Sequence, residues 1–247
     1  PPGQIIVLNR AGGELSGVPA TLPPTVKPKA YKLDMRRRTC EALLARRVLV
    51  VEGATEYLSL PAAARALSSI DSGKYSSLEA LGIAVVDAET DTQIAPLSIY
   101  FKSLGKTVFA AFDQQQPAQL SEIGTACDHP FQSPESSFEK LVLNHCDPTA
   151  LRRFAGELEQ TGEWPPHLAA NPPSGWADDA ALKDGLRAYF GWQKASGSIA
   201  LLLESCEESE MPEYIRTTIA SIKGIVIPVP EPAPAEPQPE DDAGKPD

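Results

Sequence analysis

The sequence has 247 residues, 42% of them hydrophobic and 22% charged, which is the composition of a globular protein with one large domain or two small ones. Its formal net charge of −11 argues against a protein that binds nucleic acid through a broad basic surface. Its four cysteines form no CxxC pair, and no apolar run reaches membrane-spanning length, so we expect a cytoplasmic protein with no structural zinc and no membrane partner.

The first 45 residues are predicted to be an N-terminal connector and a helix. Ile5 to Leu8 has the pattern of a strand, the glycines and prolines between residues 12 and 28 are typical of a connector, and Leu33 to Ala45 is predicted to be helical. The sequence therefore reads as if it started in mid-protein, and we expect a domain upstream of it.

Residues 46–134 alternate between strand and helix patterns. Val48 to Val51 is a continuous apolar run, typical of a strand buried on both faces of a parallel sheet, and Thr55 is placed to cap the alanine-rich helix that follows. The same alternation predicts two more strands and one more helix, namely strands at 82–86 and 107–112 and a helix at 94–104 that ends before Gly105.

An acidic residue follows each of the three predicted strands. These residues are Glu52, Asp87 and Asp113. Ligands of open parallel sheets bind outside the carboxyl ends of the strands, so we expect the three carboxylates to converge there.

The first strand end carries a second glutamate. In Glu52-Gly53-Ala54-Thr55-Glu56, the glycine lets the chain turn sharply, and both glutamates can then reach one metal ion. Alternatively, Glu56 only favours the positive end of the helix dipole, and Glu52 is an exposed loop residue.

The remainder of the chain is predicted to be helical over residues 135–224, and the apolar run 224–227 is a candidate for a last strand that returns to the sheet. Residues 228–247 hold seven prolines, six acidic residues and one lysine, so we expect a disordered tail that carries five of the eleven negative charges. The rest of the chain is then only mildly acidic, as a carboxylate-rich metal site would make it.

The order of strands and carboxylates resembles a Toprim domain, in which a glutamate follows the first strand and an Asp-x-Asp pair follows the third. Here the pair reads Asp113-x-Gln115. An amide oxygen can bind a divalent cation but brings no charge, so this departure would alter metal affinity or preference. The resemblance implies an α/β fold, a Rossmann-like parallel sheet flanked by helices, with a mostly helical second domain.

Two features of the helical part resemble the C-terminal region of class 2 OLD (overcoming lysogenization defect) nucleases. They are Ser136-Ser137-Phe138-Glu139, at a predicted helix start, and Lys194, in a Gly/Ser-rich loop. Helix capping is the alternative explanation for Ser137 and Glu139, and a solvated surface position is the alternative for Lys194.

This resemblance implies a metal-dependent endonuclease that nicks and cleaves double-stranded DNA with two Mg²⁺ ions, which Mn²⁺ or Ca²⁺ can replace in binding. Glu52, Glu56 and Asp113, with Gln115 nearby, are assigned to one ion, and Asp87, Ser137 and Glu139 to the other. Lys194 would stabilise charge on the phosphate, so the catalytic set is Lys194, Glu52 and Asp113.

The same resemblance implies an ABC-type ATPase upstream in the full-length protein, through which a homodimer could form, and a role in bacterial defence or repair. A second hypothesis is a non-catalytic Toprim module that binds nucleic acid or a partner subunit, which Gln115 and the acidic composition favour. A nucleotide-binding doubly wound fold is a weaker third, because no glycine-rich loop follows the first strand.

Overall fold

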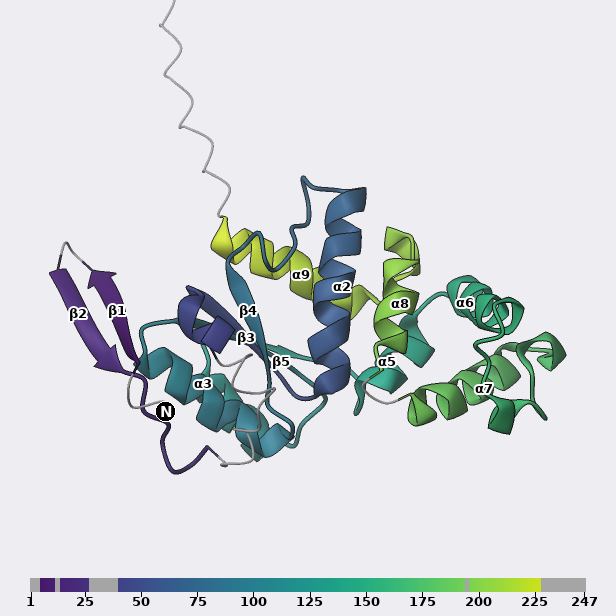
Figure 1. Ribbon diagram of the computed structural model, residues 1–247, viewed down its shortest axis with the longest axis horizontal. Helices are drawn as coiled ribbons and strands as arrows, with labels where there is room; N and C mark the ends of the chain where they lie inside the picture. The colour runs from purple at the N-terminus through teal and green to yellow at the C-terminus, as the bar shows by residue number, and fades with distance from the viewer. Residues whose placement is uncertain (1–4, 12–13, 27–39, 194–195, 228–247) are drawn as a thin grey trace, which may run out of the picture.

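The computed structural model describes residues 5–11, 14–26, 40–193 and 196–227 (Figure 1). Its centre is a parallel sheet in the order β4-β3-β5-β6, and a separate hairpin pairs β1 with β2. The strands are β1 (Ile6–Ala11), β2 (Glu14–Pro19), β3 (Arg47–Val51), β4 (Ile83–Asp87), β5 (Thr107–Phe112) and β6 (His129–Gln132).

Helices surround the sheet and form most of the second half of the chain (Figure 1). The α-helices are α2 (Ala54–Ile70), α3 (Ile94–Ser103), α4 (Pro117–Ala126), α5 (Phe138–His145), α6 (Pro148–Gln160), α7 (Asp179–Trp192), α8 (Ser198–Glu204) and α9 (Glu213–Val226). Short 3₁₀ turns are η3 (Asp91–Gln93), η4 (Pro166–Leu168), η5 (Pro173–Gly175) and η6 (Glu208–Glu210). Residues 40–44 are also helical.

The two central strands are buried on both faces, as their apolar sequences require. In β3, Leu49 and Val51 belong to one hydrophobic cluster, whereas Val48 and Val50 belong to another on the opposite face. Side chains alternate between the faces of a strand, so the sheet separates two cores. The first core joins the sheet to α2 and to α5 through α9, and the second joins it to α3 and α4.

The α/β fold and the three predicted strands are confirmed. The strands at 48–51, 83–87 and 107–112 all belong to the parallel sheet, and α2 and α3 follow the first two of them as expected. Helices also fill the part of residues 135–224 that the structure describes, except for short turns and loops. The boundaries assigned to the domains stay a prediction.

Three expectations were wrong in detail. The apolar run 224–227 is not a strand, because it continues α9, in which Ile215, Ile219 and Ile222 are buried at helical spacing. Thr55 does not cap α2, because the helix begins at Ala54 and its N-cap is Gly53. The predicted connector contains β2, which pairs antiparallel with β1.

Two elements of the core had not been predicted. The edge strand β6 has the sequence His-Pro-Phe-Gln, which lacks an apolar run and includes a proline that only an edge strand accommodates. The helix α4 precedes it.

Within the described ranges, no helix combines the length and apolarity that crossing a bilayer requires. Of the helix predicted at 33–45, only the part from residue 40 onward is described, and residues 40–44 are helical. The tail predicted at 228–247 lies wholly outside the described residues.

Candidate metal centre

The predicted carboxylates lie at the carboxyl edge of the sheet, at the ends of three adjacent parallel strands. Val51 pairs with Asp87 on one side and with Ala111 on the other, so Glu52 begins the chain segment that leaves the sheet between β4 and β5. The backbone N–H of Asp113 donates a hydrogen bond to Oε2 of Glu52, at 3.1 Å. The first and third strand ends are therefore in direct contact.

Gln115 contacts the same glutamate. Its Nε2 donates a hydrogen bond to Oε2 of Glu52 at 3.1 Å, so this oxygen accepts from both an amide side chain and a backbone N–H. Where the Toprim pattern has a second aspartate, this chain has a neutral donor that stabilises the Glu52 carboxylate.

Glu56 comes to the site from the first turn of α2. Its side chain is buried, and its Oε2 lies so close to Gly53 that a Cβ atom added there would be 3.3 Å from this oxygen. The missing side chain at Gly53 thus gives the Glu56 carboxylate room to fold back over the turn. Gly53 itself has an extended backbone, with a φ of −152°, so its contribution is the space that it leaves for Glu56, and the shared metal site of the two glutamates stays a prediction.

Burial and mutual repulsion disfavour ionisation in this cluster. Burial is the main cause that raises the pKa of Glu56 to about 7, and the charges of Glu52, Glu139 and Asp87 add to it. Burial likewise raises the pKa of Asp113 to about 8, with contributions from Glu56, Glu52 and Glu139. Glu52 and Glu139 are thus close enough to both Glu56 and Asp113 for their charges to disfavour ionisation of these two groups.

The pKa of Glu52 is also raised, but two hydrogen bonds to its carboxylate counteract part of the increase. Burial is the main cause, and the charge of Asp91 in η3 adds to it, while the hydrogen bonds from Asp113 and Gln115 lower the pKa. The donors at Glu52 thus offset part of the cost of placing a carboxylate there.

Glu139 brings the helical part of the chain to the same place. It lies in the first turn of α5, and its Oε1 accepts a hydrogen bond from the Thr55 hydroxyl at 3.3 Å. Thr55 therefore links the start of α2 to the start of α5, and the charge of Glu139 reaches both Glu56 and Asp113.

Ser137 and Asp87 are partly engaged by the backbone. The Ser137 hydroxyl is the N-cap of α5 and accepts the N–H of Lys140 at 3.2 Å, which agrees with the capping explanation. Asp87 is buried at the end of β4, and its Oδ1 accepts the N–H of Glu89 at 2.7 Å in a tight turn where Glu89 has a φ of 63°. Their roles as metal ligands stay predictions.

Lys194 lies outside the described residues. Two of its described neighbours, Gln193 and Gly197, line a small cleft together with Thr55 and Glu139. The chain segments on either side of the lysine thus border the site, and its catalytic role stays a prediction.

Two residues near the site had not been singled out. The positive charge of Lys140 lowers the pKa of Asp113, and its Nζ donates to Ser136 Oγ at 2.8 Å. The Tyr214 hydroxyl donates to the Phe131 carbonyl at 2.8 Å. Burial raises the pKa of that tyrosine, and the charges of Asp113 and Glu56 add to the effect. Lys140 directly follows Glu139 and could have been noticed, whereas nothing in the sequence places Tyr214 of α9 near the sheet edge.

The site fits a divalent cation by its chemistry. Its donors are oxygen atoms, which Mg²⁺ and Ca²⁺ prefer, and a cation would relieve the repulsion that raises the pKa values. Among the described residues, no three His, Cys, Asp or Glu side chains are close enough to hold one ion by themselves. Mg²⁺ sites commonly use one or two carboxylates and complete the coordination with water, so this arrangement remains compatible with the ion.

Comparisons with known proteins agree with this geometry. The family described as "Overcoming lysogenization defect protein-like, TOPRIM domain" matches residues 43–114. The fold is similar to that of the C-terminal region of the Burkholderia pseudomallei OLD protein, with a TM-score of 0.52 and 20% identity over 74% of this chain and 99% of that one.

A second solved structure gives the same picture. The C-terminal region of the Xanthomonas campestris pv. campestris OLD protein has a TM-score of 0.54 and 18% identity, over 74% of this chain and 96% of that one. A comparison with curated proteins found no match in sequence. The sheet edge that gathers the carboxylates lies largely within the matched segment.

Proposed function

Because residues 43–114 belong to the family of OLD-like Toprim domains, on a fold shared with the C-terminal regions of OLD proteins, we propose that this chain is a metal-dependent DNA endonuclease. The observation that carries the proposal is the convergence of acidic side chains from the sheet and the helical part: Asp113 donates its N–H to Glu52, and Thr55, at the start of α2, donates to Glu139 of α5. The charges of Glu52 and Glu139 in turn raise the pKa of both Glu56 and Asp113. Its substrate would be double-stranded DNA, and its coupling to an upstream ATPase and any homodimer belong to the same proposal.

Divalent ions would take ligands from Glu52, Glu56 and Asp113 on the sheet side, and from Asp87, Glu139 and Ser137 on the side of α5. Water would complete the coordination, because among the described residues no three acidic side chains are close enough to hold one ion by themselves. When bound, such ions make water acidic enough to act as hydroxide and neutralise charge on the phosphate. We assign Mg²⁺, with Mn²⁺ or Ca²⁺ as substitutes in binding, because every donor is a hard oxygen.

The chain's own residues position these carboxylates. The hydrogen bonds to Glu52 from Asp113 and Gln115 fix one carboxylate oxygen, and the Thr55 hydroxyl fixes one oxygen of Glu139. Lys194 would place an ammonium beside the scissile phosphate, where a compact positive charge stabilises the developing negative charge. Lys140, whose charge already acts on Asp113, is a second cation from α5.

The test is nicking of supercoiled plasmid in Mg²⁺ and in Mn²⁺, combined with calorimetric titration of the same proteins with Mn²⁺. Asp113→Asn and Glu56→Gln should lower the cleavage rate about 100-fold or more and also weaken Mn²⁺ binding, because each removes a charged ligand. Lys194→Ala should slow cleavage to a similar extent but leave Mn²⁺ binding almost unchanged.

Glu157→Gln is the matched control, because Glu157 is an exposed glutamate on α6. It should cleave and bind metal as the parent does. Cleavage that persists in Asp113→Asn, or that Glu157→Gln abolishes equally, would contradict the assigned site.

One observation favours the alternative, a non-catalytic Toprim module that binds nucleic acid or a partner subunit. The Gln115 amide already donates to Glu52, so the unmetallated site carries one charge fewer than the Asp-x-Asp pattern would give. DNA binding without cleavage in both Mg²⁺ and Mn²⁺ would support this alternative.

A further inference from the structure

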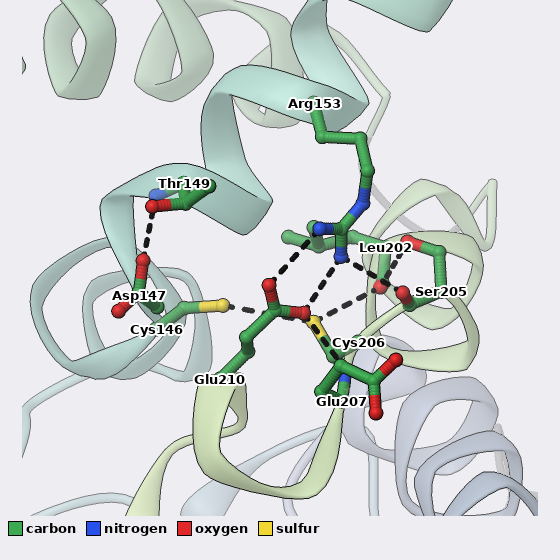
Figure 2. Close-up of polar contacts among 9 residues, drawn as sticks. All are labelled: Cys146, Asp147, Thr149, Arg153, Leu202, Ser205, Cys206, Glu207 and Glu210. Carbon is green, nitrogen blue, oxygen red and sulfur yellow. Dashed lines mark hydrogen bonds and ion pairs between the residues drawn. The ribbon is translucent and has the colours of Figure 1, made fainter.

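Two buried thiols face each other in the helical part, outside the acidic site (Figure 2). Cys146 is the C-cap of α5, and Cys206 follows the end of α8. Their Sγ atoms are 3.8 Å apart, and the side chains are 3% and 4% exposed. The thiols are in contact but not bonded, since a disulfide bond measures about 2.0 Å.

The segments that carry the two thiols are held together by a network of polar contacts (Figure 2). Arg153 donates to both carboxylate oxygens of Glu210, at 2.9 and 2.7 Å, and to the carbonyl of Ser205 at 2.9 Å. The N–H of Asp147 donates to the carbonyl of Glu210 at 3.0 Å. These contacts join α6 to the loop after α8. They therefore hold in place the two chain segments that carry the thiols.

The contact within the pair favours the charged form of one thiol. A hydrogen bond from the Cys146 thiol is the main cause that lowers the pKa of Cys206, whereas burial and the charge of Glu210 oppose it, and the charge of Arg153 offsets part of this opposition. The thiolate is the form of cysteine that reacts with oxidants. With the two sulfurs 3.8 Å apart, we assign Cys206 as the first nucleophile and Cys146 as the neighbour placed to react with the product.

We propose that Cys146 and Cys206 form a redox modification site, at which a small peroxide oxidises the two thiols to an intramolecular disulfide. The Cys206 sulfur attacks one oxygen of hydrogen peroxide, the O–O bond breaks, and the leaving hydroxide takes the thiol proton to become water. Cys146 then attacks the resulting sulfenic sulfur, the S–O bond breaks, and a second water leaves. Two thiols are oxidised as one peroxide is reduced to two waters.

The bond would connect two elements that border the acidic site. α5 carries Glu139 in its first turn, and α8 begins at Ser198, which lines the same cleft as Glu139. Closing the sulfur contact from 3.8 Å to bonding distance would tie the end of α5 to the loop after α8. The inference goes beyond the proposed cleavage of DNA, and it does not depend on it.

The test uses the reduced full chain, treated with hydrogen peroxide, alkylated at its remaining thiols and digested for peptide mass analysis. We expect a peptide pair cross-linked through Cys146 and Cys206, lighter by two hydrogen masses, that dithiothreitol separates again. The oxidised chain should unfold at a midpoint roughly 5–15 °C higher than the reduced chain, since a long loop has been closed. Recovery of both cysteines only as free thiols or as over-oxidised acids would overturn the proposal.

Cys127→Ser is the matched control. Cys127 is also buried, but it lies in the hydrophobic cluster on the other face of the sheet, and burial raises its pKa to about 11. This variant should keep the cross-link and the midpoint shift, whereas Cys206→Ser and Cys146→Ser should lose both. If these serine variants do not fold, the peptide masses of the parent chain decide the question alone. Neither readout involves DNA, so a failure here is distinct from a failure of the proposed nuclease.

Discussion

At the scale of single residues, Gln115 changes the electrostatics of the acidic site. Its amide donates to Glu52, where a carboxylate would have added another negative charge to a cluster that already includes Glu56 and Asp113. A neutral residue thus reduces repulsion in the metal-free protein but also reduces the attraction for a cation. In the proposed metal site, the glutamine would therefore lower the affinity for a cation and stabilise the metal-free state.

We predict that Gln115→Asp binds divalent cations more tightly, by on the order of tenfold, because ligand charge is a main determinant of affinity in oxygen-donor sites. Calorimetric titration with Mn²⁺ in metal-free buffer measures this difference. Gln114→Asp is the control, because Gln114 is an exposed neighbour that adds the same charge. Equal affinities of the parent and Gln115→Asp would show that residue 115 does not face the metal.

The site could be predicted where the sequence itself fixes the geometry. Glu52, Asp87 and Asp113 each follow a strand of one parallel sheet, so the strand pattern places them at one edge. The contact between Thr55 and Glu139 could not be derived in this way, because 84 residues separate them and only the packing of the helical part against α2 and the sheet brings them together. The resemblance to a known family predicted Glu139 as a site residue, but not its contact with Thr55.

At the scale of elements, the hydrogen bond from Thr55 to Glu139 joins the sheet half of the site to α5. We predict that Thr55→Val and Glu139→Gln are coupled. Valine keeps the shape of threonine but removes the donor, so it should lower the free energy of unfolding by about 0.5–1.5 kcal/mol in the parent and by less when Glu139 is already glutamine.

Urea unfolding of the parent, the two single variants and the double variant measures this coupling. An interaction free energy of about 0.5 kcal/mol or more is expected, whereas a cycle that is additive within about 0.3 kcal/mol would mean that the hydroxyl does not hold Glu139. Thr55→Val combined with Glu157→Gln, on the distant helix α6, should be additive.

The elements themselves were predictable in proportion to the regularity of their sequences. β3 and β5 have continuous apolar runs and were found within a residue of their ends, whereas β6 is a short edge strand with a proline and gave no signal. The end of α9 was mistaken for a strand because its last residues are a short apolar run, and its helical period appears only from Ile215 onward. Short apolar runs do not by themselves distinguish a strand from a buried helix.

At the scale of the whole molecule, the raised pKa values make stability depend on pH. Glu56 and Asp113 hold their protons more tightly when folded, with pKa values of about 7 and 8 against ordinary values of 4.5 and 3.8. Between roughly pH 4 and pH 8 the folded chain therefore binds more protons than the unfolded chain, and the free energy of unfolding falls as the pH rises.

We predict that the metal-free protein has a lower unfolding midpoint at pH 8.5 than at pH 5.5, and that Mg²⁺ raises the midpoint more at pH 8.5, where protons no longer compete for the carboxylates. Thermal unfolding in EDTA and in Mg²⁺ at both pH values measures the effect. The double variant with Glu56→Gln and Asp113→Asn isolates these two groups and should flatten the pH dependence. If the unfolding midpoints of the parent and the double variant change with pH to the same extent, the pH dependence of stability comes from other groups.

The division of the interior into two cores has a consequence for how the molecule can open. The cluster beneath α3 and α4 includes no residue of α5 through α9, so the helical part can separate while that face of the sheet stays covered. Leu49, Val51 and Phe109, however, belong to the cluster that the helices complete. Partial unfolding of the helical part would thus expose the strands that lead into Glu52 and Asp113 and remove Glu139 in the same event. The complete acidic site therefore requires the helical part to be folded against the sheet. Most of its carboxylates nevertheless come from the sheet, whose other face is covered by α3 and α4.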